Sequence, residues 1–239
     1  MSLVNNGITR IPPGINAEVL GSIFNNIRKP NPLQYHEYYQ DFDTYAAADW
    51  TVTETQAGAT QALTAGDGGL ILLTNSAADD DVNQIQKLPV NFLMEATKEL
   101  YFAARFAISD VVESDAFIGL QVANTDGSGA VTDGLYFLKA DGDASLLVRL
   151  RKNTTTGATQ ADTTIDLVNA TQIVVAAYYD GIDRLYYAVN GAVLGYLDAS
   201  AAFLPDTALA PIAGVKNGEA VAKTMTVDYI YVAKARYSL

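Results

Sequence analysis

The stretch Arg184-Leu-Tyr-Tyr-Ala-Val-Asn-Gly-Ala-Val-Leu-Gly-Tyr-Leu197 decides the fold class of this chain. Two runs rich in aromatic and β-branched residues flank Asn190-Gly191, and an Asn-Gly pair supplies the two positive-φ residues that a type I′ turn requires. The stretch therefore predicts a hairpin of two antiparallel strands.

The same alternation of side chains continues over the chain from about residue 40. In the segment 100–108, Leu100, Phe102, Ala104, Phe106 and Ile108 fall on one face, and Arg105 falls on the other. Further strands are expected in 49–53, 68–74, 117–122, 134–139, 145–151, 173–179 and 224–233. Many short strands between Gly, Asn and Asp turns predict an all-β fold, a two-sheet antiparallel jelly-roll sandwich over residues 41–239.

Residues 1–40 differ from this pattern and are expected to form an amino-terminal arm. Two prolines stiffen the extended segment 11–15, and apolar residues at helical spacing predict a short amphipathic helix over 16–29. The arm either folds back on its own domain or lies on a neighbouring chain, and we expect the second. The residues expected to make that contact are Ile11, Pro12, Pro13, Ile15, Leu20, Ile23 and Phe24.

Composition narrows the classes of function. The 239 residues include no cysteine and one histidine, so a thiol nucleophile and a cysteine-bound metal are excluded. The net charge of −12 argues against nucleic acid and anionic membrane as partners, and no apolar run reaches the roughly 18 residues of a membrane helix. Only 18% of the residues are charged while 49% are hydrophobic, which suits a protein whose surface is partly covered in an assembly.

Several segments together resemble a known fold family. Asp49-Trp50, the segment 98–110 and Asp115-Ala-Phe-Ile-Gly-Leu120 resemble the concanavalin-A-like jelly roll of the laminin-G type. The segments 133–137, 209–218 and 227–232 resemble jelly-roll proteins of tailed-bacteriophage structural modules. The resemblance covers residues 40–239 and implies two curved antiparallel sheets, with a role in virion decoration or in a fibre.

Catalytic patterns are mostly missing. Some jelly rolls are glycosidases with two carboxylates across the sugar bond, and the laminarinase-like branch carries them as Glu-x-Asp-x-x-Glu on one strand. The nearest match here is Glu113-Ser-Asp115, which lacks the second glutamate and is interpreted as a turn. His36 stands beside Glu37 without a nucleophile motif such as Gly-x-Ser-x-Gly. No catalytic residue and no cofactor is therefore expected.

Two binding chemistries remain open. Calcium could use the oxygen ligands of 79–83 or of Asp141 and Asp143, but neither matches a known loop spacing, so no metal is expected. Sugar binding could use the 14 tyrosines, which include the pairs 38–39, 178–179 and 186–187. Because neighbouring residues of a strand point to opposite faces, each pair offers at most one outward ring.

The leading hypothesis is a non-enzymatic bacteriophage structural protein, a capsid decoration or cement protein. It would be made in the host cytoplasm and would sit on the capsid exterior as a homo-oligomer, plausibly a trimer. Its partner would be the major capsid protein or another virion protein. The alternative is a carbohydrate-binding or receptor-binding jelly-roll module of a phage fibre or tail. A glycosidase is the third hypothesis.

Overall fold

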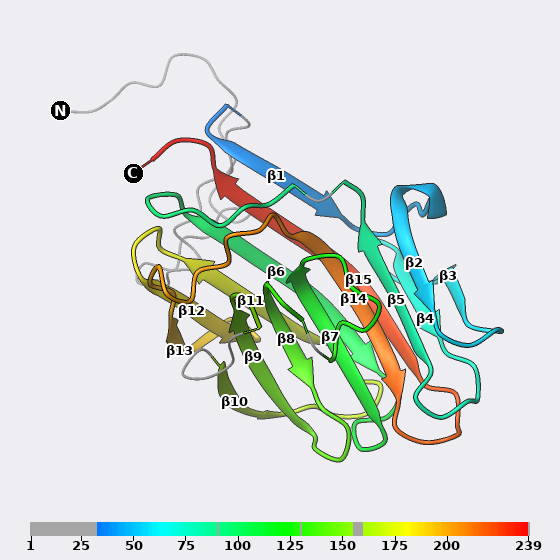
Figure 1. Ribbon diagram of the computed structural model, residues 1–239. Helices are drawn as coiled ribbons and strands as arrows, with labels where there is room; N and C mark the ends of the chain where they lie inside the picture. Colours follow the sequence, from blue (N-terminus) through cyan, green and yellow to red (C-terminus); the bar gives the residue numbers. More distant parts are fainter. Residues whose placement is uncertain (1–32, 90, 130, 155–159, 239) are drawn as a thin grey trace.

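Two antiparallel sheets face one another across a single apolar core (Figure 1). The computed structural model describes residues 33–89, 91–129, 131–154 and 160–238. The all-β, two-sheet sandwich predicted from the sequence is thereby confirmed, and a short 3₁₀ turn at Ala47–Asp49 is the helical element of the described residues.

Sheet A forms the back layer in Figure 1 and runs in the order β13-β12-β11-β6-β15-β4-β3. Strand β1 pairs with the second half of the long strand β15, beyond the part that pairs with β4. The bounds are β1 (Tyr35–Gln40), β3 (Thr60–Thr64), β4 (Leu70–Thr74), β6 (Leu100–Ile108), β11 (Ile173–Tyr179), β12 (Arg184–Val189), β13 (Ala192–Asp198) and β15 (Thr224–Ala235).

Sheet B lies in front of it, in the order β10-β9-β8-β7-β14-β5-β2. Its strands are β2 (Trp50–Glu54), β5 (Val82–Lys87), β7 (Ser114–Gln121), β8 (Gly134–Lys139), β9 (Ser145–Arg151), β10 (Gln160–Asp166) and β14 (Ala210–Asn217). Strands close in sequence are paired as hairpins, whereas β14 separates β7 from β5 and β15 separates β6 from β4.

The alternation read from the sequence correctly predicts which side chains enter the core. The five apolar residues of one face of β6 are all buried between the sheets, and Arg105 points outward to pair with Asp228. The β12–β13 hairpin turns at Asn190 (φ 48°) and Gly191 (φ 80°), as expected for the Asn-Gly pair.

The amino-terminal boundary of the sandwich differs from the predicted position at residue 41. Strand β1 pairs with β15 from Tyr35 onward, so the sheet includes residues 35–40, which the sequence pattern places in the arm. The predicted helix over 16–29 and the seven predicted contact residues of the arm, Ile11 to Phe24, lie outside the described residues. The described part of the chain contains no helix that is long and apolar enough to cross a bilayer.

Candidate functional site

The outer face of sheet A carries a cluster of tyrosines, here called the tyrosine face. The three tyrosine pairs of the sequence each divide as predicted: Tyr38, Tyr179 and Tyr187 pack on the core, and the other member of each pair points outward. The tyrosine face consists of Tyr35, Tyr39, Tyr101, Tyr178, Tyr186, Tyr196, Tyr229 and Tyr231.

Strand register brings four of these rings into one row. Tyr101 on β6 is the cross-strand partner of Tyr178 on β11, which pairs with Tyr186 on β12, which pairs with Tyr196 on β13. The ring centroids of Tyr178 and Tyr186 are 6.4 Å apart, and those of Tyr186 and Tyr196 are 5.9 Å apart. Aromatic pairs at this range stabilise each other and hold the row in place.

A second group of rings continues the row onto β15 and β1. The centroid of Tyr231 lies 5.8 Å from that of Tyr101 and 6.1 Å from that of Tyr39, and Tyr39 lies 6.4 Å from Tyr229. The aromatic surface therefore spans six adjacent strands, from the sheet edge at β13 to β1.

Three alanines form the floor beside the row. Ala103, Ala176 and Ala188 are cross-strand partners on β6, β11 and β12, and they cluster with Tyr101 and Tyr229. They are at most 7% exposed. Because alanine is short, the floor lies lower than the tyrosine row beside it.

Carboxylates accept hydrogen bonds from the tyrosine hydroxyls. Glu99 accepts from Tyr178 at 2.6 Å and from Tyr35 at 3.4 Å. Asp41 accepts from Tyr39 at 2.6 Å, and burial together with this bond raises the pKa of Tyr39 to about 12. These hydroxyls are therefore protonated at neutral pH and donate to carboxylates that keep further lone pairs for other donors.

The cations on this face already have partners. The guanidinium of Arg105 forms an ion pair with Asp228, which is 5% exposed. Arg184 lies over the ring of Tyr196, with its Cζ 4.8 Å from the ring centroid, and its Nε is 3.9 Å from Asp183. The polar groups that remain open to a ligand are thus mainly hydroxyls and carboxylates.

The outer face of sheet B, in contrast, is filled by the loop 122–133, of which the structure describes residues 122–129 and 131–133. Phe117 and Tyr136 point outward from this sheet, yet they are fully buried in a cluster with Val131 of the loop. The side-chain amide of Gln84 donates to the Asn124 carbonyl at 2.8 Å and accepts from the Gly127 amide at 2.9 Å. Gln121 donates to the Gly127 carbonyl and Gln86 to the carbonyls of Gln121 and Val122. The centre of this face is occupied by the chain itself.

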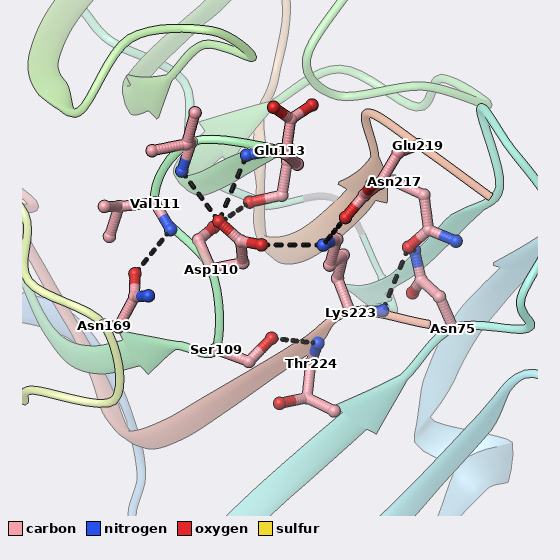
Figure 2. A network of polar contacts seen from close by, with 12 residues as sticks. Asn75, Ser109, Asp110, Val111, Glu113, Asn169, Asn217, Glu219, Lys223 and Thr224 are labelled. Atoms are coloured by element: carbon pink, nitrogen blue, oxygen red, sulfur yellow. Dashed lines mark hydrogen bonds and ion pairs between the residues drawn. The ribbon is translucent and has the colours of Figure 1, made fainter. Parts of the chain in front are cut away.

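A network of polar contacts joins the loops at one end of the sandwich (Figure 2). The Lys223 side chain is 5% exposed, and its Nζ donates to Asp110 at 2.7 Å and to Glu219 at 2.5 Å. The Lys223 bond, followed by the backbone amide of Val112, lowers the pKa of Asp110 to about 2. These bonds tie the β6–β7 turn to the β14–β15 turn.

Three of the carboxylates considered for calcium, those of Asp80, Asp81 and Asp143, bind protein donors. Asp80 pairs with Lys216 at 2.9 Å. Asp143 accepts from the Ser145 amide. The buried Asp81 accepts from the Thr55 hydroxyl and from the amides of Gln56 and Ser76. Within the described ranges, no three His, Asp or Glu side chains gather in a way that could hold a metal ion.

The residues considered for hydrolysis lie apart from the tyrosine face. Glu113 belongs to the turn before β7, where its amide donates to Asp110, and Ile118, at the position of the missing glutamate, is buried in the core. Burial raises the pKa of Asp115, whose carboxylate accepts from the Asp141 amide. His36 stacks on Phe92 with centroids 4.5 Å apart, as a packed residue does.

A pocket of about 280 Å³ lies between the segments 93–96 and 201–206. Its lining is mainly apolar, with Met94 and Leu204 among the buried residues. Lys152 at its rim pairs with Asp206 at 3.2 Å. The pocket offers little polar recognition, so the tyrosine face is the stronger candidate site.

The sequence predicted one outward ring in each tyrosine pair, but it did not show that Tyr39, Tyr178 and Tyr186 are these rings or which residues surround them. Neither Glu99 nor the alanine floor was singled out. The alternation in 100–108 puts Tyr101 and Ala103 on one face, which is the signal that could have found the β6 part of the site. The lateral order of the strands, which brings β11, β6 and β15 together, is not readable from that alternation.

No protein-family model and no curated protein sequence matches this chain. Solved structures do match. An endo-1,3-beta-glucanase from Streptomyces sioyaensis is 14% identical over 87% of this chain and 99% of its own, with a TM-score of 0.63. The potassium-bound Emp46p carbohydrate recognition domain is 11% identical over 80% and 93%, with a TM-score of 0.54. Peanut lectin is 15% identical over 84% and 97%, with a TM-score of 0.53. These neighbours show that the fold is a concanavalin-A-like, lectin-type jelly roll.

The comparisons correct the prediction that the protein is not an enzyme. Besides the glucanase, the Crh5 transglycosylase (TM-score 0.56) and an endo-beta-1,4-glucuronan lyase from Trichoderma reesei (TM-score 0.57) have this fold. Enzymes and lectins share this sandwich, because function depends on the side chains of the site and not on the fold alone. The fold is therefore compatible with catalysis.

Proposed function

We propose that this protein is a carbohydrate-binding jelly roll that holds glycans on the tyrosine face of sheet A. The observation that carries the proposal is the row of partly exposed tyrosines, beside which Glu99 and Asp41 accept hydrogen bonds from the hydroxyls of Tyr178 and Tyr39. Binding sites for small molecules combine aromatic surface with a few placed polar groups, and a sugar ring offers an apolar face and hydroxyl donors to match them.

The neighbours of the same fold support this choice over the leading hypothesis from the sequence. Their names include a lectin and a carbohydrate recognition domain, and none of the structures named above is a virion protein. The role in capsid decoration, the capsid partner, the homo-oligomer and the location on the virion exterior therefore stay predictions. A fibre or tail setting would be compatible with glycan binding.

Binding can be tested with the full chain on a glycan array and by affinity electrophoresis in gels that contain soluble polysaccharides. The double variant Tyr186→Ala, Tyr196→Ala should weaken binding at least tenfold, because it removes two adjacent rings of the row. Tyr237→Ala is the matched control, since this tyrosine is 69% exposed and lies outside the row. Absence of binding to every glycan, or equal binding by the folded double variant, would contradict the proposal.

The same incubations should be assayed for new reducing ends, because enzymes share the fold. If sugar is released, Glu113→Gln and Glu99→Gln separate the two candidate carboxylates. Loss of turnover in the first variant would place the chemistry at the β6–β7 turn, and loss in the second would place it on the tyrosine face.

A further inference from the structure

We infer that the ligand of the tyrosine face is an extended, uncharged polysaccharide chain that lies across the strands of sheet A. This inference rests on the proposed function and adds the ligand class and its direction. It follows from a repeat in the site, from the exposure of the row along its length, and from the charges around it.

The repeat consists of one tyrosine and one alanine on each of three adjacent strands. Tyr101 and Ala103 on β6, Tyr178 and Ala176 on β11, and Tyr186 and Ala188 on β12 are matched residue for residue by the strand register. In each pair the alanine stands two positions from the tyrosine on the same face, so the three alanines form a low, buried strip beside the three rings. An identical unit repeated at the strand spacing of about 4.8 Å suits a ligand that itself repeats.

The row is most exposed at its two ends. Tyr196 on the edge strand β13 is 55% exposed and Tyr39 on β1 is 57% exposed, whereas the rings between them are half-buried. Six strands from β13 to β1 span about 24 Å, which is several sugar units. A surface of this length with accessible ends fits an internal stretch of a chain rather than a terminal sugar held in a pocket.

The charges of the face favour a neutral chain. Carboxylates of Glu37, Asp41 and Glu99 take hydroxyl donors on the face, while Arg105 is paired with Asp228. The whole chain carries a net charge of −12. A polymer of uronic acids would face like charge, and the guanidiniums of Arg105 and Arg184 already lie beside Asp228 and Asp183, whereas sugar hydroxyls can donate to the carboxylates.

The test measures affinity against ligand length and charge by isothermal titration and affinity electrophoresis. The probes are neutral glucan, xylan and mannan with their oligosaccharides of two to six units, and polygalacturonate, alginate and glucuronan as acidic polymers. We expect at least one neutral polymer to bind, its hexasaccharide to bind at least tenfold more tightly than its disaccharide, and the acidic polymers to bind at least tenfold more weakly.

Ala176→Leu tests the repeat directly, because leucine would fill the middle unit of the floor from the outer face of the sheet. It should reduce the affinity for the hexasaccharide about tenfold in a chain that circular dichroism shows to be folded, with some loss of melting temperature because Ala176 is only 7% exposed. Val174→Leu is the matched control on the same strand and face, outside the three units. Equal affinity for all lengths, preference for acidic polymers, or unchanged binding by Ala176→Leu would overturn the inference while leaving glycan binding intact. Absence of binding to any glycan would remove the proposed function as well.

Discussion

The outer faces of the two sheets both carry large aromatic side chains, but they use them differently. On sheet A, Tyr178 and Tyr186 stand beside alanines and remain partly open to solvent. On sheet B, Phe117 and Tyr136 have no exposed surface because the loop 122–133 packs on them. The comparison teaches that an outward position on a strand is not yet a surface position. What crosses over the strand decides whether an aromatic ring contributes to stability or to binding.

The largest expected effect is on the closed face. Phe117→Ala should lower the free energy of unfolding by about 3–5 kcal/mol, since it removes a fully buried ring from a packed cluster. Tyr186→Ala on the open face should cost less, about 1 kcal/mol, because its ring is only partly buried. Urea unfolding of both variants, followed by circular dichroism, measures the difference. Losses of similar size would break the comparison between the two faces.

The same contrast shows how far the sequence could predict this molecule. Alternation correctly assigned the core residues of β6 and predicted that each tyrosine pair divides between the two faces, because the period of two is a local property of a strand. It could not tell that outward Phe117 is buried and outward Tyr178 is not. That depends on where the loop 122–133 lies and on hydrogen bonds of Gln84 to residues some 40 positions away, which are tertiary facts.

The candidate site was predicted only in its parts. Tyr101, Tyr178 and Tyr186 are distant in the sequence, and they become one row because β6, β11 and β12 are neighbours in matching register. Glu99 joins the row from the residue before β6, where nothing local marks it as a partner of Tyr178. The resemblance to concanavalin-A-like proteins predicted the fold correctly, but it could not fix the function, since enzymes and lectins share that fold.

A medium effect is expected at the end of the sandwich, away from both faces. Lys223→Met keeps the aliphatic stem but leaves Asp110 and Glu219 without their cation, and both carboxylates are partly exposed and can be hydrated. We expect a loss of about 1–2 kcal/mol at neutral pH, below the range for a fully buried pair. Glycan binding should stay unchanged, which separates global stability from the tyrosine face.

The pH dependence of the free energy of unfolding tests whether the loss in Lys223→Met comes from the pairing with Asp110. Because the folded pKa of Asp110 is lowered to about 2, the contribution of its pairing is complete above the ordinary aspartate pKa of about 3.9 and is lost as the pH falls toward 2. The difference in free energy of unfolding between Lys223→Met and the unmodified chain should therefore shrink over that interval. A difference that stays constant down to pH 2 would show that the stability of the network does not depend on the Asp110 charge.

The smallest expected effect is a shift in the alkaline titration of the tyrosine hydroxyls between the folded and the unfolded chain. Burial, followed by the coulombic influence of Tyr229, raises the pKa of Tyr101 to about 12, and burial with the Asp41 bond does the same for Tyr39. Because these folded values exceed the ordinary tyrosine pKa of about 10, the stabilisation is present below pH 10 and is lost as the pH rises through 12. The tyrosinate absorbance of the folded chain should thus continue to rise up to about pH 12, whereas that of the urea-unfolded chain should be complete soon after pH 10. Glu99→Gln should lower the pKa of Tyr178, whose hydroxyl it binds, whereas Glu113→Gln should not. If Tyr39 of the folded chain ionised near pH 10, its hydroxyl would not be held as a donor to Asp41, and the polar half of the proposed site would be wrong.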